Sequence, residues 1–265
     1  MESCITFKNL SIGYRSKHQL RAIASAVSAS LQPGELTCLI GANGVGKSTL
    51  LRTLCGFQPA LDGEIFLQDQ PLSAYPAQQL ARQIGVVLTS RVDVPQLSVR
   101  EIVGIGRSPY TNFWGTLTPA DQQIVDEAIH QVGIPHLAQR NISELSDGER
   151  QKTMIAKALA QQTRIIILDE PTAFLDFPSK VETLQMLLRL AHEQHKAILL
   201  STHDVELALQ LADSLWLMEP GHLSIGTPRE LSQAGSLSRF IERDGIRYDK
   251  ENMKIEILPS FGHQP

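Results

Sequence analysis

Residues 41–49 of this 265-residue chain read Gly41-Ala42-Asn43-Gly44-Val45-Gly46-Lys47-Ser48-Thr49, and this stretch decides the fold. It fits the pattern GxxxxGK(S/T), follows the apolar run 36–40 and opens a helical pattern over 47–56. A glycine loop between a strand and a helix lets backbone N–H groups and the helix N-terminus converge on phosphate oxygens. We therefore predict a triphosphate site, in which Lys47 reaches the terminal phosphates and Ser48 is a ligand of Mg²⁺.

A pair of acidic residues follows an apolar run later in the chain. Residues 165–168 are all apolar and end at Asp169 and Glu170. Adjacent side chains of a strand point to opposite sides, so one carboxylate can serve a metal and the other a water molecule. We assign Asp169 to Mg²⁺ and Glu170 to the attacking water as a general base. An acidic pair at a strand end is ordinary by itself, so this assignment depends on the glycine loop.

The hydrophobic pattern predicts an α/β chain with a P-loop NTPase-type core, in which helices alternate with a mainly parallel sheet. The strands are expected at 36–40, 164–168 and 196–201, and the helices at 149–161 and 179–194. Alternating β-forming residues near the start of the chain indicate an N-terminal antiparallel β part.

Two further regions interrupt or follow this core. Prolines break helical patterns from about residue 90 onward, which indicates a helical subdomain inserted at about 90–160. After a short helical pattern, residues 246–258 contain two alternating segments, which predict a small C-terminal β-hairpin. We divide the chain into a main domain, 1–232, which contains the glycine loop and the inserted subdomain, and a tail of helix and hairpin, 233–265.

A third motif identifies the family. Leu145-Ser146-Asp147-Gly148-Glu149, of which Ser146 lies 23 residues before Asp169, is called the signature segment below. Together with Asp169-Glu170-Pro171-Thr172, Phe174-Leu175-Asp176 and His203, it resembles the ATPase subunit of ABC transporters over about residues 5–226. The resemblance implies a head-to-tail homodimer, in which ATP on the loop of one copy is covered by the signature segment of the other.

The resemblance also implies roles for single residues. Lys47, Glu170 and His203 are expected to be catalytic, and Asp176 belongs to a loop that communicates between the two copies. Tyr14 matches the aromatic that stacks on adenine. The expected nucleotide ligands are Tyr14, Gly41, Asn43, Gly44, Gly46, Lys47, Ser48 and Thr49 and, from the other copy, Ser146, Asp147, Gly148 and Glu149. Structural interpretations stay open: Tyr14 as an ordinary strand aromatic, Asp176 as a loop charge and His203 as a strand-end histidine.

The signature segment has a structural interpretation too, since Ser146-x-x-Glu149 is a capping box that starts a helix. Two positions depart from the family pattern. Asp147 stands where glycine is usual and brings a carboxylate close to the partner's phosphate, so we expect its side chain to turn to solvent. Thr89 stands where a glutamine is expected, and its hydroxyl could reach Mg²⁺ through a water molecule.

The stretch Ile105-Gly106-Arg107-Ser108-Pro109-Tyr110 looks like the importer ATPases that serve iron-siderophore, haem and cobalamin permeases. This likeness implies an ATP-driven motor with integral membrane permease subunits as partners and, indirectly, a substrate-binding protein. In such proteins the helical subdomain docks the permease, and exposed Tyr110, Phe113 and Trp114 would suit that contact. The alternative is that these aromatics fill the subdomain's own core.

Composition excludes several other classes. The net charge is −4 and no basic block occurs, so nucleic acid is not an expected partner. No run approaches the roughly 20 apolar residues of a membrane span. Three cysteines without metal-ligand spacing fit a reducing cytoplasm, so we expect a cytoplasmic protein, peripheral on the inner face of the cell membrane.

Two other function classes remain open. One is a different phosphate-loop enzyme, although none of the five asparagines is followed by lysine, as a guanine-reading Asn-Lys-x-Asp motif of a GTPase requires. The other is a non-transport ABC ATPase that acts as a nucleotide-gated assembly or regulatory module.

Overall fold

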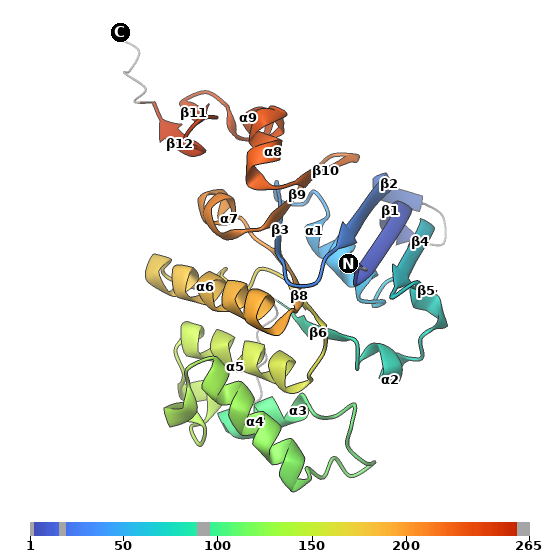
Figure 1. Cartoon of the computed structure of the whole chain (residues 1–265), viewed down its shortest axis with the longest axis vertical. Coiled ribbons are helices and arrows are strands. Elements are labelled where there is room, and N and C mark those ends of the chain that lie inside the picture. The colour runs from blue at the N-terminus through green and yellow to red at the C-terminus, as the bar shows by residue number, and fades with distance from the viewer. Residues whose placement is uncertain (1–2, 16–19, 89–95, 259–265) are drawn as a thin grey trace.

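The computed structural model describes residues 3–15, 20–88 and 96–258, and a six-stranded sheet forms its centre (Figure 1). The strand order is β10-β9-β3-β8-β7-β6, in which only the β9–β10 pair is antiparallel. Every residue of β3, β7 and β8 is buried, as expected where helices cover a parallel sheet. The predicted core is thereby confirmed. Its strands are β3 Leu36–Gly41, β6 Ile84–Val87, β7 Ile165–Leu168, β8 Ala197–Ser201, β9 Ser214–Glu219 and β10 His222–Gly226.

The N-terminal β part is a separate antiparallel sheet with the order β2-β1-β4-β5. Its strands are β1 Ile5–Arg15, β2 Leu20–Leu31, β4 Asp62–Leu67 and β5 Gln70–Pro71. Phe7 of β1 meets Trp216 of β9 edge to face, with ring centroids 5.5 Å apart. Buried leucines of α1, Lys47–Leu54, complete the core between the two sheets. The glycine loop that precedes α1 is therefore held by both sheets.

The inserted helices form the lower part of Figure 1, away from the N-terminal sheet. Helices α3 Val99–Ile105, α4 Pro119–Gln131 and α5 Asp147–Ala160 pack on one another. Short 3-10 turns lie at η2 Pro135–Leu137 and η3 Ile142–Glu144, and η1 Leu72–Ala74 precedes α2 Ala77–Leu80. The longest helix, α6 Phe177–Gln194, begins two residues earlier than the sequence pattern indicated.

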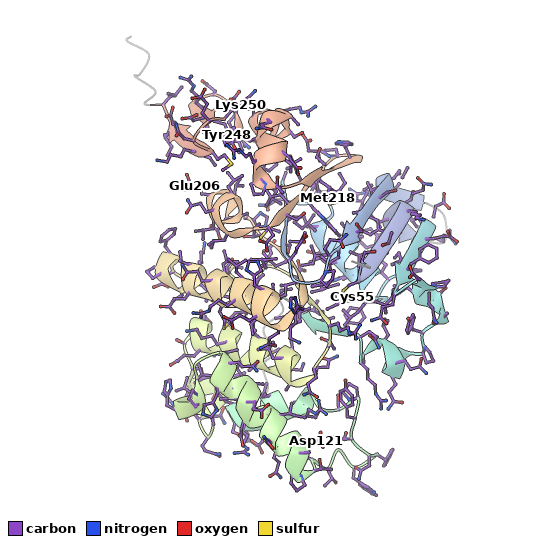
Figure 2. All side chains as sticks on the ribbon, in the orientation of Figure 1. Cys55, Asp121, Glu206, Met218, Tyr248 and Lys250 are labelled. Carbon is purple, nitrogen blue, oxygen red and sulfur yellow. The ribbon has the colours of Figure 1, made fainter. Side chains whose placement is uncertain are left out.

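The last three helices are α7 Val205–Leu211, α8 Pro228–Gln233 and α9 Ser236–Ile241, and the hairpin of β11 Ile246–Asp249 and β12 Lys254–Ile257 follows them. The predicted hairpin is present, and Figure 2 labels Tyr248 and Lys250 in it. Tyr248 is buried, and its hydroxyl donates to Ser232 Oγ at 3.1 Å. The division of the chain at residue 232 stays a prediction, and α8 crosses this position. In the described part of the chain, no helix is both long and apolar enough to span a bilayer.

Candidate functional site

The glycine loop between β3 and α1 depends on contacts that leave no room for side chains. A Cβ at Gly46 would lie 2.3 Å from Ile23 Cγ2, and one at Gly41 would lie 2.5 Å from Met218 O. Gly46 also has a φ of +114° and Gly44 a φ of +74°, in the left-handed region that favours glycine. The loop conformation therefore requires glycine at Gly41, Gly44 and Gly46.

Lys47 is buried at the start of α1 and points back into the loop. Its ammonium donates to Gly41 O at 2.9 Å and to Ala42 O at 3.3 Å. Burial lowers the pKa of Lys47, and the negative charges of Glu170 and Asp169 oppose that shift. A cation held beside convergent backbone N–H groups is suited to bind phosphate oxygens.

The acidic pair directly follows β7 and lies beside the carboxyl end of the neighbouring parallel strand β8. Asp169 Oδ1 accepts from Ser48 Oγ at 3.0 Å and from Ser201 Oγ at 2.8 Å. The Glu170 N–H donates to Ser201 Oγ at 2.9 Å. Asp169 thus lies beside Ser48, the other residue assigned to Mg²⁺ in the sequence analysis, whereas Ser201 was not predicted.

Glu170 and His203 meet across the cleft. His203 Nε2 and Glu170 Oε1 are 2.5 Å apart. Both side chains are partly exposed and line the same cavity. An imidazole beside a carboxylate can hold that carboxylate in one orientation, so the pair can position an acid–base group next to phosphate.

Lys47, Glu170 and His203 line one cleft of about 310 Å³, together with residues of the glycine loop. Tyr14 is half-exposed at its edge, and its hydroxyl is 3.1 Å from Thr49 Oγ1. Two residues of β2 that sequence reasoning missed, Arg21 and Ile23, also line the cleft, and the β1–β2 register places Arg21 opposite Tyr14. The complete lining is Tyr14, Arg21, Ile23, Asn43, Gly44, Gly46, Lys47, Ser48, Thr49, Glu170 and His203.

The signature segment lies at the N-terminus of α5, and none of its residues is among those that line the described cleft. The predicted capping box is present: Ser146 Oγ accepts from Glu149 N at 3.3 Å, and Ser146 N donates to Glu149 Oε2 at 2.9 Å. The Ser146 N–H and the Ser146 hydroxyl both donate to the Glu149 carboxylate and lower the pKa of Glu149. Asp147 is exposed in this single copy of the chain.

Asp176 and Thr89 complete the predicted set. Asp176 is the N-cap of α6, and its Oδ1 accepts from Ser179 N at 3.1 Å. Hydrogen bonds from the Ser179 hydroxyl and from the Ser179 N–H lower the pKa of Asp176. This cap is a structural role that the sequence analysis did not assign. Thr89 lies outside the described residues.

The side-chain oxygens of Ser48 and Asp169 fit a magnesium ion. Ser48 Oγ and Asp169 Oδ1 are 3.0 Å apart, and hydroxyl and carboxylate oxygens are ligands that Mg²⁺ prefers. Among the described residues, no group of three or more His, Cys, Asp or Glu could hold a metal. Few protein ligands are typical of Mg²⁺ bound together with substrate phosphates, so the pair fits that ion.

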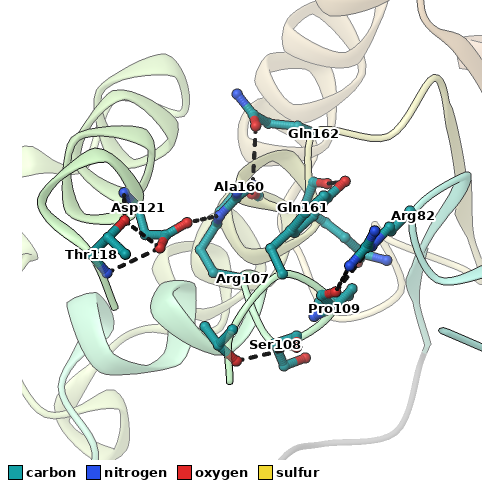
Figure 3. A network of polar contacts seen from close by, with 11 residues as sticks. Arg82, Arg107, Ser108, Pro109, Thr118, Asp121, Ala160, Gln161 and Gln162 are labelled. Atoms are coloured by element: carbon teal, nitrogen blue, oxygen red, sulfur yellow. Dashed lines mark hydrogen bonds and ion pairs between the residues drawn. The ribbon is translucent and has the colours of Figure 1, made fainter. Parts of the chain in front are cut away.

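The aromatic residues of the helical subdomain fall into two groups. Phe113 and Trp114 are 95% and 84% exposed and stack edge to face at 5.5 Å, so the interpretation that they fill the subdomain core is wrong. Tyr110 is less exposed, at 37%, and its ring lies 4.1 Å from the Arg107 guanidinium carbon. Figure 3 shows that Arg107 joins α4 to the end of α5 through Asp121 and Ala160.

The amino-acid sequence matches a family profile and is similar to several known proteins. The profile described as ABC transporter matches residues 24–173. The hemin import ATP-binding protein HmuV of Bordetella pertussis is 39% identical over 238 residues, which cover 85% of this chain and 89% of that protein. The petrobactin import ATP-binding protein FpuD of Bacillus anthracis is 32% identical over 263 residues, which cover 99% of this chain and 92% of that protein.

A solved structure resembles the whole fold. It is that of cbiO1 from Clostridium perfringens, part of the ABC transporter complex cbiONQ. The TM-score is 0.78 at 26% sequence identity, and the match covers 90% of this chain and 94% of that chain. The arrangement of the two sheets and the inserted helices is thus one that occurs in an ABC cassette.

Proposed function

Because the chain belongs to the ABC transporter family, whose ATP-binding proteins are ATPases, we propose that it is the ATP-hydrolysing subunit of an importer. Two copies close head to tail over two ATP molecules, and closing and reopening drive a separate membrane permease. One observation carries this proposal. The glycine loop, Glu170 and His203 line a single cleft, and Asp169 is hydrogen-bonded to Ser48 of its lining, whereas the signature segment lies outside that cleft.

Within the cleft, each side chain has one task. Lys47 and the loop N–H groups hold the triphosphate, and Tyr14 stacks on the adenine. Glu170 takes a proton from the attacking water at Oε2, because Oε1 is already bonded to His203. Ser48 and Asp169 would hold Mg²⁺, which supplies positive charge to the phosphate oxygens.

The second copy supplies what the cleft lacks. The capped N-terminus of α5 presents backbone N–H groups and the positive end of a helix dipole, which favour an anion. Placed over the partner's cleft, Ser146, Gly148 and Glu149 would contact the terminal phosphate of that copy. Asp176, at the start of α6, would report on closure to the other site.

The partner and cargo follow from the relatives and from an exposed surface. HmuV and FpuD are named for the import of hemin and petrobactin, so we expect a chelated-iron, haem or cobalamin-type cargo here. Phe113 and Trp114 offer exposed apolar area to permease loops. A substrate-binding protein would act indirectly, and the chain would lie on the cytoplasmic face of the membrane.

Two substitutions test the catalytic part. Lys47→Ala should abolish high-affinity ATP binding in a nucleotide titration, because a charge-assisted contact of about 1.5–3 kcal/mol and its neighbours are lost. Glu170→Gln should still bind ATP and accumulate closed dimers with little phosphate release. The exposed residues Lys254 and Glu206 provide matched controls, Lys254→Ala and Glu206→Gln. Normal turnover in Glu170→Gln would remove Glu170 from the role of base.

Copurification tests the transport part. The chain should be recovered with a many-span permease from detergent-solubilised membranes, and the double substitution of Phe113 and Trp114 by Ser should reduce that recovery. Recovery with soluble partners alone would favour a nucleotide-gated assembly module over a transporter subunit.

A further inference from the structure

Ser201 is the last residue of β8, and its side chain lies between the two acidic residues without being exposed itself. The hydroxyl donates to Asp169 Oδ1 at 2.8 Å and accepts from Glu170 N at 2.9 Å. Strands β7 and β8 are parallel neighbours in which Leu168 pairs with Leu200, so Ser201 stands directly beside Asp169. One hydroxyl therefore uses both its donor and its acceptor on the acidic pair.

The bond to Glu170 matters because the backbone of that residue is strained. Glu170 has a φ of +50°, in the left-handed region, which costs a residue with a Cβ about 1–2 kcal/mol. The preceding N–H, that of Asp169, still belongs to the sheet and donates to Val87 O at 2.8 Å. At Glu170 the chain leaves the sheet, and the Ser201 hydroxyl takes the N–H that the sheet no longer pairs.

The bond to Asp169 sets the direction of a carboxylate. Asp169 Oδ1 accepts from Ser201 on the strand side and from Ser48 on the loop side. The two hydroxyls together orient the carboxylate toward the start of α1. Ser201 itself is not among the residues that line the described cleft, so it acts only through its neighbours.

We propose that Ser201 is a positioning residue for ATP hydrolysis, which holds Asp169 toward Ser48 and fixes the backbone turn that aims Glu170 at His203. This inference rests on the roles proposed above for Asp169 and Glu170. It predicts an effect on turnover and on the local backbone, with little effect on nucleotide affinity.

The test compares Ser201→Ala with the wild-type chain. The alanine variant should lose about 10- to 100-fold in kcat, in keeping with the loss of a general base that is no longer held in place, while KM for ATP changes less than about twofold. The Kd for ATP measured in EDTA should be unchanged. In nucleotide-free protein, the Glu170 amide should exchange its hydrogen faster, which reports the lost bond without any turnover.

Two further variants separate positioning from folding. Ser201→Cys keeps the side-chain size and weakens both hydrogen bonds, so its kcat should lie between those of the other two forms. Thr183→Val is the matched control, because Thr183 is equally buried and its hydroxyl donates only to Ser179 O, at 2.8 Å in α6. The control should retain wild-type kcat at an equal folded fraction. Should the alanine variant not fold, the cysteine variant decides by the same measurements.

Each outcome has one meaning. Wild-type kcat in Ser201→Ala or Ser201→Cys, with Glu170→Gln inactive, overturns the role of Ser201 and leaves the proposed function intact. A loss expressed as a higher KM instead of a lower kcat, or an equal loss in Thr183→Val, also overturns it. Turnover in Glu170→Gln would instead overturn the catalytic assignment on which the inference rests.

Discussion

Two ion pairs of similar length in the helical subdomain differ in burial, and burial decides what each is worth. Arg107 Nε is 2.9 Å from Asp121 Oδ1, with 6% and 10% of the two side chains exposed. Arg100 Nη2 is 2.8 Å from Asp126 Oδ2, with 37% and 42% exposed. We therefore compare Arg107→Ala with Arg100→Ala as perturbations matched in chemistry and geometry.

The expected magnitudes follow from what each guanidinium touches. Arg107 also donates to Ala160 O at 2.9 Å and to Gln162 Oε1 at 3.1 Å, and it stacks on Tyr110 (Figure 3). Removing one partner of a buried pair leaves an uncompensated charge and costs about 3–5 kcal/mol of unfolding free energy. An exposed pair such as Arg100–Asp126 contributes about 0–1 kcal/mol.

Urea unfolding of both variants, followed by far-ultraviolet circular dichroism, measures the two losses under one condition. Adding Asp121→Asn to Arg107→Ala should recover part of the loss, because the unpaired charge is then gone while the bonds to Thr118 can persist. Equal losses in the two single variants would refute the reasoning. So would a double variant no more stable than Arg107→Ala.

Three further predictions concern the proposed nucleotide sites. Arg21 lines the cleft, and none of the described residues forms an ion pair with it. Arg21→Ala should therefore raise the Kd for ATP about two- to fivefold, as the loss of an exposed cation contact of about 0.5–1 kcal/mol implies. Calorimetric titration measures this, and an unchanged Kd would exclude the contact. Asp147→Gly should strengthen ATP-dependent dimerisation in analytical ultracentrifugation, whereas unchanged dimerisation and turnover would show that the carboxylate does not oppose closure. The pKa of Glu149 is lowered below 4.5 in the folded chain, so its negative charge stabilises the fold at pH values above the unfolded-state pKa, and this contribution is lost as pH falls through the folded-state pKa. The difference in unfolding free energy between wild type and Glu149→Gln should therefore shrink below pH 4.5 in urea titrations. A difference that stays constant with pH would contradict this.

The parts of the site that the sequence predicts are those set by local backbone rules. A glycine loop followed by a lysine and a hydroxyl residue, between a strand and a helix, is typical of a phosphate-binding site. Asp169 follows four apolar residues, which predict the buried strand before it. The helix cap at Asp176 was also readable, because an aspartate two residues before Pro178 is a common way to start a helix. These features need no information about which strands become neighbours.

The parts that the sequence does not predict depend on neighbours from distant segments. Ser201 meets Asp169 only because β8 pairs with β7, and nothing in the residues around Ser201 signals that pairing. Gly46 needs its small size because Ile23 of the other sheet packs on it. Arg21 lines the cleft because the strand register sets it opposite Tyr14. Hydrophobic periodicity and turn residues can be recognised in a single sequence, whereas these contacts can be predicted only when the order of the strands in the sheets is known.

A chain of hydrogen bonds through β6, the edge strand of the sheet, connects the loop that carries Phe113 and Trp114 with the acidic pair. The Pro109 carbonyl, four residues before Phe113, accepts from Arg82 Nη2 at 2.8 Å. Gln161, at the end of α5, donates to Ala81 O and, at 3.1 Å, to Ile84 O, so both anchors reach the segment that enters β6.

At the other end of that strand, Val87 O accepts the N–H of Asp169. If a permease docks on Phe113 and Trp114 as proposed, moving this loop would displace β6 and the backbone of the acidic pair, unless the contacts of Pro109 and of Gln161 with the segment before β6 break. These unbroken contacts connect the loop mechanically with the acidic pair. Energetic coupling also requires that the contacts have two conformations, which nucleotide and permease stabilise to different degrees.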